Sequence, residues 1–171
     1  MRIMSIDAEV DGLYGESFAI ALTIREDGKE IYSWSGRAPD SSVTDEWVKT
    51  HVLPALADMP VTHTSSSELE EAFWLQWMQY KSGCAVIAHC GSPVETGLFR
   101  RCVERDVEGR QWDAPYPAIH DVATLLLIAG EDPASVDKYL SKKGIKVQFN
   151  GVPHHPMYDA VAAAQVWEAL S

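Results

Sequence analysis

The chain opens with the stretch Met1-Arg2-Ile3-Met4-Ser5-Ile6-Asp7-Ala8-Glu9, which predicts a core strand that ends in two carboxylates. The apolar residues favour a buried strand as far as Ile6, and residues two apart on a strand point to the same face, so Asp7 and Glu9 are expected side by side. Two such charges repel and lose solvation unless a cation lies between them. Carboxylate oxygens suit Mg²⁺ or Mn²⁺, so the pair indicates a divalent cation; a solvated strand end with two unrelated acids is the simpler alternative.

The composition is that of a folded, acidic protein. With 171 residues, 46% of them hydrophobic and 23% charged, the chain is expected to form one domain over residues 1–171. No apolar stretch is long enough to span a bilayer and no signal-peptide pattern is present, so no membrane partner is expected. Three cysteines without zinc spacing (Cys84, Cys90 and Cys102) favour reduced thiols and a cytoplasmic location. The net charge of −11 argues against coating duplex DNA, but an enzyme whose carboxylates bind metals stays open.

Local patterns predict an α/β fold. Strands are expected at residues 1–7, 18–24 and 31–35, and the turn Glu26-Asp27-Gly28-Lys29 makes the last two a hairpin, which gives an antiparallel meander. Shorter strands are expected at residues 84–88 and 118–121. Helices are expected at residues 45–57 with a break around Pro54, at 67–81 with Ser67 as N-cap, from Ser92 onward, at 122–129, at 135–143 closed by Gly144, and at 156–170. This order predicts a mixed sheet flanked by helices.

Two helical patterns have mainly structural interpretations. Leu69, Phe73, Trp77 and Tyr80 recur at helical spacing and predict a core-facing stripe. Arg100, Arg101 and Arg105 follow one another on the helix after Ser92 and predict a solvated face, with phosphate contact as the alternative.

Two further segments carry candidate acids. Glu95 lies in the first turn of a helix that follows a buried strand; a capping box with Ser92 and a catalytic role are both open. His154-His155-Pro156-Met157-Tyr158-Asp159 places a histidine before the last helix and an aspartate inside it. Taken alone, His154 is typical of a surface loop and Asp159 of an acid that interacts with the helix dipole.

Together the three segments resemble the DEDD superfamily of 3′–5′ exonucleases, the DnaQ-like branch of the ribonuclease H fold, and His154 points to its DEDDh subclass. The family's first motif often reads Asp-x-Glu-x-Thr-Gly-Leu, and residues 7–13 match it apart from Asp11. The second often reads Ala-His-Asn, a short gap, then Phe-Asp-x-x-Phe-Leu, and is similar to Ala88-His89-Cys90 followed by Val94-Glu95-Thr96-Gly97-Leu98-Phe99. The third usually reads His-x-x-x-x-Asp-Ala, which residues 154–160 fit. The resemblance covers nearly the whole chain and implies a ribonuclease H-like mixed sheet.

Two departures concern the second motif. Glu95 stands where the family usually has Asp, after a loop one residue longer, and Cys90 replaces the usual Asn. The longer Glu side chain lets the helix retreat slightly and still present its carboxylate. Between the second and third motifs, Ile119-His120-Asp121-Val122 resembles an Asp-Thr-Leu stretch of the family.

The resemblance implies a metal-dependent 3′–5′ exonuclease that hydrolyses phosphodiester bonds at the 3′ end of single-stranded RNA or DNA. Two divalent cations, Mg²⁺ or Mn²⁺, about 3.5–4 Å apart perform this chemistry in such enzymes. It implies that Asp7 bridges both cations, that Glu9 and Asp159 bind one of them, and that Glu95 acts on the other through water.

The resemblance also implies roles for a histidine and a loop. His154 is expected to be the general base, since the pKa of imidazole lies near neutral. His155 is the rival, but His154 is preferred because its four-residue gap to Asp159 matches the motif, whereas His155 leaves only three residues. Gly12 and Leu13 match the place where the family's backbone and leucine meet the terminal nucleotide. An ordinary turn after a strand is the alternative for these two residues.

Three rival functions stay open at this point. The first is a catalytically inactive ribonuclease H-like module that binds nucleic acid, and the second is a hydrolase with one metal held by His154, His155 and Asp159. The third keeps the fold but replaces the polymer by a nucleotide. The sequence does not distinguish RNA from DNA, and a homodimer is suggested only by analogy with relatives.

Overall fold

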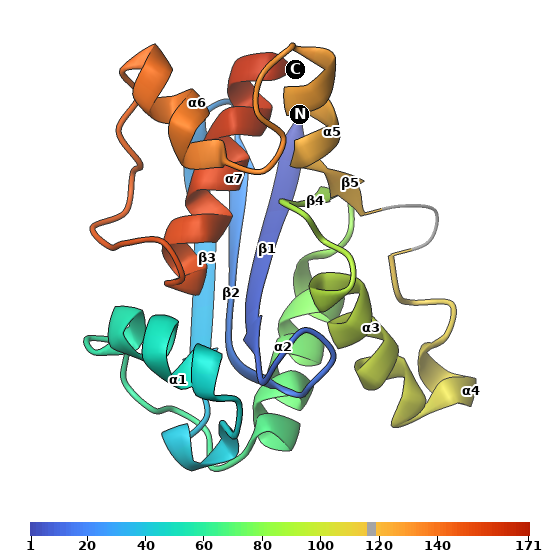
Figure 1. Ribbon diagram of the computed structural model, residues 1–171. Coiled ribbons are helices and arrows are strands. Elements are labelled where there is room, and N and C mark those ends of the chain that lie inside the picture. Colours follow the sequence, from blue (N-terminus) through green and yellow to red (C-terminus); the bar gives the residue numbers. More distant parts are fainter. Residues whose placement is uncertain (116–118) are drawn as a thin grey trace.

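The computed structural model describes residues 1–115 and 119–171 and contains a five-stranded mixed sheet flanked by helices (Figure 1). The strand order is β3-β2-β1-β4-β5. Strands β1 (Arg2–Val10), β2 (Ser17–Glu26) and β3 (Lys29–Arg37) form the predicted antiparallel meander. The short strands β4 (Ala85–Ala88) and β5 (His120–Asp121) run parallel to β1 and to β4 respectively. The predicted α/β class is confirmed; of the strand expected at residues 118–121, residue 118 lies outside the described part.

The hairpin between β2 and β3 forms at the predicted turn. Asp27 and Gly28 both adopt positive φ angles, 52° and 77°. A two-residue turn with both central residues in this region matches the twist of the strands that it joins. The Asp-Gly pair therefore fixes the register of the meander.

Helices cover both faces of the sheet. Successive residues of β1 point to opposite faces, so neighbouring apolar residues of this strand pack against different helices. Met4 packs in the core formed with α2 (Ser66–Tyr80) and α3 (Val94–Glu104). Ile3 packs in the core formed with α5 (Val122–Ile128), α6 (Val136–Lys143) and α7 (Pro156–Leu170). The remaining elements are η1 (Asp40–Ser42), α1 (Glu46–His51), η2 (Leu53–Leu56) and α4 (Val107–Arg110). In the described parts of the chain, no helix is long and apolar enough to cross a membrane.

Most helix ends agree with the predictions, and two N-caps do not. Helix α6 begins after the N-cap Ser135 and ends at Gly144, whose φ is 68°. The N-cap of α2 is Ser65 and not Ser67, because the Ser65 hydroxyl accepts the N–H of Glu68. Helix α3 begins at Val94 without a side-chain cap from Ser92.

A solvated face is predicted for Arg100, Arg101 and Arg105 at the end of α3, but two of these side chains bind a buried carboxylate. Glu70 of α2 is fully buried and accepts hydrogen bonds from Arg101 at 2.8 Å and from Arg105 at 2.8 Å. A buried carboxylate requires such partners. Arg100 is the most exposed of the three, with Glu104 as an ion-pair partner 3.6 Å away. The predicted apolar stripe of α2 does lie in the core.

Candidate functional site

Asp7 and Glu9 lie in the second half of β1, on the face of the sheet that α7 covers. Ala21 lies opposite Asp7 across the β1–β2 pair and packs against Met157 and Val161 of α7. Because directly paired residues of neighbouring strands share a face, the side chain of Asp7 points toward α7. Strand β4 pairs with β1 only over residues 3–5, so on the side of β1 away from β2 no described strand lies beside these acids.

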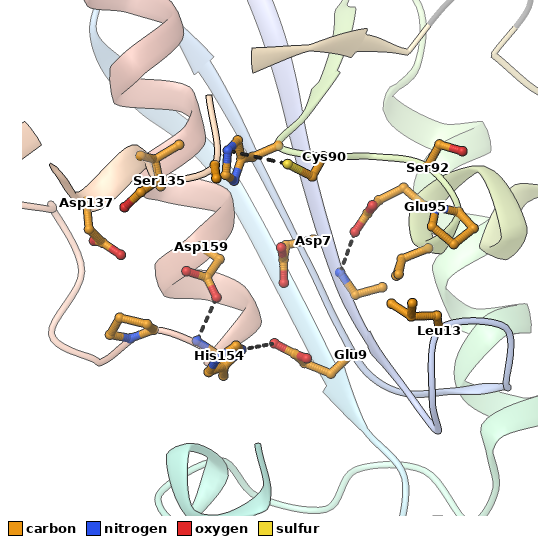
Figure 2. A pocket seen from close by; sticks show the side chains of 17 residues that line it. Asp7, Glu9, Leu13, Cys90, Ser92, Glu95, Ser135, Asp137, His154 and Asp159 are labelled. Atoms are coloured by element: carbon orange, nitrogen blue, oxygen red, sulfur yellow. Dashed lines mark hydrogen bonds and ion pairs between the residues drawn. The ribbon is translucent and has the colours of Figure 1, made fainter. Parts of the chain in front are cut away.

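Glu95 reaches the same place from the other side of β1. Its side chain is 3% exposed, and Oε1 accepts the backbone N–H of Ala8 at 3.1 Å. Since β4 stops short of Ala8, this N–H has no strand partner, and the Glu95 carboxylate satisfies it. The capping box with Ser92 is therefore wrong, and the carboxylate lies beside the cavity (Figure 2).

Asp159 and His154 come from the start of α7 and the loop before it. Asp159 Oδ2 accepts the backbone N–H of His154 at 2.8 Å, which fixes the loop against the helix. His154 has a φ of 69°, a strained conformation for a residue other than glycine. Its ring is half exposed, and Nδ1 lies 3.9 Å from Oε1 of Glu9. The imidazole therefore lies at the rim of the acidic cluster rather than inside it.

The donor atoms of this cluster lie close enough to share a metal ion. One atom each from Glu9, His154 and Asp159 lie within 4.8 Å of one another. Oδ2 of Asp7 is buried and has no hydrogen-bond partner in the structure. A buried carboxylate oxygen without a partner is costly, and an oxygen-rich set of this kind suits Mg²⁺ or Mn²⁺. The residues present thus fit a divalent cation.

Burial raises the pKa of all four carboxyl groups. Desolvation is the largest cause for Asp7 and Glu9, and repulsion from Asp159 and Glu95 adds to it. Desolvation also raises the pKa of Asp159 to about 7 and that of Glu95 to about 8. Among the described residues, the one basic side chain within ion-pair distance of these carboxylates is that of His154. At neutral pH the cluster therefore holds either protons or a cation.

His155 points away from the cluster. Its Nδ1 accepts the N–H of Met157 at 3.2 Å and so caps α7. The ring packs against Phe149 with centroids 4.9 Å apart, and burial lowers the pKa of His155. The single-metal site built from both histidines and Asp159 is therefore not assembled.

Two adjoining cavities meet at the acids. The larger, about 600 Å³, is lined by the four carboxylates, Leu13 and His154 (Figure 2). The second, about 410 Å³ and mainly apolar, shares Glu9, Leu13 and His154 with the first and is completed by Gly12 and Trp47 among others. Leu13 is 64% exposed and Gly12 has a φ of 69°, as an exposed turn requires. Trp47 stands edge-on to His154, and no sequence signal identified it as a site residue.

Asp11 connects the two walls of the apolar cavity. Its carboxylate accepts the N–H groups of Thr44 and Asp45 at 2.9 and 2.8 Å and the Thr44 hydroxyl at 2.7 Å. These bonds lower the pKa of Asp11 and hold the start of α1 against the loop after β1. The residue thereby positions Trp47 opposite Leu13.

Asp121 holds the loop after β4 in a similar way. Its carboxylate accepts the N–H groups of Cys90 at 3.0 Å, Gly91 at 3.1 Å and Ala123 at 2.9 Å. Cys90 has a φ of 55°, where Asn is better tolerated than Cys. Asp121 therefore keeps in place the loop that leads to Glu95, and its position before a helix was the only signal for this role.

The structure brings five predicted residues to one cavity: Asp7, Glu9, Glu95, His154 and Asp159. Leu13 lines the same cavity and Gly12 the neighbouring one. No protein-family model matches the chain, and a search of the curated proteins finds no match. Function is therefore inferred from the geometry of this site and from the motif pattern.

Proposed function

We propose that the protein is a metal-dependent 3′–5′ exonuclease of the DEDDh type with a ribonuclease H-like fold, acting on single-stranded RNA or DNA. The observation that carries this proposal is the convergence of four carboxylates from β1, α3 and α7 on one cavity, with Glu95 buried, the other three partly buried, and a histidine at the rim. The sheet order β3-β2-β1-β4-β5, with β2 running opposite to its neighbours, supports the fold assignment.

The carboxylates would hold two divalent cations, Mg²⁺ or Mn²⁺. Asp7 is central, because its Oδ2 has no hydrogen-bond partner among the described residues and because Asp159, Glu9 and Glu95 all repel its carboxylate. Glu9 and Asp159 lie on one side with His154, and Glu95 lies on the other (Figure 2). When bound, such cations activate a water molecule and stabilise the charge on the leaving oxygen.

His154 would accept the proton of the attacking water. Its Nδ1 faces the Glu9 carboxylate, which favours a proton on that nitrogen and leaves Nε2 as the acceptor. Since the ring is half exposed, it is able to turn toward a bound phosphate without unfolding its surroundings. The proton leaves to solvent from the rim.

The apolar cavity would receive the terminal nucleoside. Its walls of Leu13 and Trp47 offer the apolar and aromatic surfaces on which bases stack, and it opens onto Glu9 and His154. A nucleoside bound there would place its 5′ phosphate at the carboxylates. The bond on the other side of this phosphate would then be cut, releasing a 5′-mononucleotide.

The main alternative is an inactive ribonuclease H-like module that binds nucleic acid. It rests on Glu95 and Cys90, the two departures from the family pattern. The position of Glu95 argues against it, since the longer side chain reaches Ala8 and lies beside the other acids. A module without metals would also leave the unpartnered Asp7 oxygen without a role.

A gel assay with 5′-labelled single-stranded RNA and DNA tests the proposal. We expect a ladder that shortens from the 3′ end in Mn²⁺ or Mg²⁺, is lost in EDTA, and is absent in Asp7→Asn. Asp27→Asn, an exposed hairpin residue at the other end of the sheet, serves as the matched control. Rates like those of the wild type in Asp7→Asn would refute the two-metal mechanism, and metal binding without a ladder would favour a nucleotide substrate.

A further inference from the structure

A third hollow adjoins the acidic cavity and shares no lining residue with the apolar cavity. It measures about 270 Å³ and shares Ser92 and Pro93 with the acidic cavity. Tyr14 forms one wall, and Gly97 and Arg100 of α3 form the other. Leu13 precedes Tyr14 in the chain and lines both the acidic and the apolar cavities, so it stands between the apolar cavity and this groove.

The groove presents an aromatic ring and a cation to solvent. Tyr14 is 79% exposed, and the Arg100 side chain is 68% exposed. Arg101, which also lines the groove, is bound to the buried Glu70 and is not available. Arg100 pairs with Glu104 across 3.6 Å at the surface, a weak contact that a phosphate would replace at little cost.

The order of the three cavities gives a path for a strand. With the terminal nucleoside in the apolar cavity and the scissile phosphate at the carboxylates, the preceding nucleotide leaves past Leu13 on the opposite side. Aromatic rings stack on bases of any sequence, and an arginine beside them binds the backbone phosphate. Tyr14 and Arg100 supply this pair of groups at the point where the strand leaves.

We propose that the groove formed by Tyr14 and Arg100 binds the penultimate nucleotide of a single-stranded nucleic acid, with its base on Tyr14 and its phosphate on Arg100. This inference rests on the proposed function, since it takes its direction from the acidic cavity. It implies that affinity increases from a mononucleotide to a trinucleotide through these two residues. Pro93 and Gly97 line the same groove.

The test compares the KM for a trinucleotide with the Ki for a 5′-mononucleotide, which fills only the terminal position. We expect Tyr14→Ala and Arg100→Ala each to raise the trinucleotide KM about tenfold. The mononucleotide Ki should move less than about twofold, and Tyr14→Phe should restore the KM. Arg2→Ala is the matched control, because Arg2 also forms one exposed ion pair but lies at the opposite end of β1.

Binding of a labelled trinucleotide to Asp7→Asn in Ca²⁺, followed by fluorescence anisotropy, separates this inference from the proposed function. Cleavage by the wild type with an unchanged KM in Tyr14→Ala and Arg100→Ala would overturn the groove and leave the exonuclease intact. Absence of cleavage, with binding weakened about tenfold by the same two substitutions, would refute the exonuclease and support the groove. Equal effects on the trinucleotide and the mononucleotide, or no binding of the trinucleotide, would overturn the groove.

Discussion

Asp159→Asn is expected to make the metal-free protein more stable than the metal-free wild type, by an amount that grows as the pH rises. Desolvation raises the pKa of the Asp159 carboxyl from 3.8 to about 7. Between the two pKa values the Asp159 carboxyl is protonated in the folded chain and ionised in the unfolded one. Its contribution to the free energy of unfolding is therefore complete below about pH 4 and is lost as the pH rises through about 7. One pKa unit corresponds to about 1.4 kcal/mol, so the wild type loses about 3 kcal/mol between pH 5 and pH 8 that the variant keeps. Asparagine still accepts the His154 N–H.

Thermal melting in EDTA at pH 5 and pH 8 measures this effect. For a chain of this length, about 3 kcal/mol corresponds to a Tm difference of roughly 6–12 °C. We expect the difference between the variant and the wild type to grow by this amount from pH 5 to pH 8, and Mn²⁺ to raise the Tm of the wild type only. Asp132→Asn is the control, since a hydrogen bond from Lys138 lowers the pKa of Asp132. A Tm difference that is the same at both pH values would refute the account of the acidic cluster, as would equal stabilisation of both proteins by Mn²⁺.

Three further substitutions test single residues of the site. His154→Ala should lower kcat by about 10²–10⁴-fold and change the Mn²⁺ affinity measured by calorimetry by less than about threefold; equal losses would make His154 a metal ligand. Glu95→Asp should lower kcat at least about tenfold, although Asp is the usual residue of the exonuclease motif that the sequence resembles. The shorter side chain no longer reaches the Ala8 N–H, which lies 3.1 Å from Oε1 of Glu95. An unchanged kcat in steady-state assays would show that this contact is dispensable. Cys90→Asn should raise the unfolding free energy by about 1 kcal/mol in denaturant titrations, since asparagine tolerates a φ of 55° better; a loss of stability would contradict this.

The parts of the fold that could be predicted from the sequence are those with local signals. The Asp27-Gly28 turn, the Gly144 helix end and the start of α7 at Pro156 all follow from backbone preferences of single residues. The N-cap of α2 could not be assigned in this way, because three consecutive serines offer the same cap. Burial of Glu70 beside Arg101 favours one of these serines, and that contact joins residues 31 positions apart.

The same limit applies to the candidate site. The spacing of Asp7 and Glu9 on a strand is local, and the structure places both in one cavity as the alternation predicts. The choice between a capping role and a site role for Glu95 was not local. It depends on where β4 ends, since the missing strand neighbour leaves the Ala8 N–H to the carboxylate. Trp47 is a similar case, because its contact with His154 crosses more than a hundred residues of sequence.

The distribution of positive charge favours action at strand ends over binding along a strand. Binding along a polyanion depends on many Lys and Arg contacts and is strongly salt-dependent. Here all seven arginines make ion pairs within the fold. In five of them the side chain is also less than a third exposed: Arg25, Arg37, Arg101, Arg105 and Arg110. With a net charge of −11, little of the surface attracts phosphate, and the attraction would concentrate where cations occupy the acidic cluster. In the proposed function the apolar cavity beside that cluster receives the terminal nucleoside, so the same acids that repel the length of a strand would, once they hold metal, select its end.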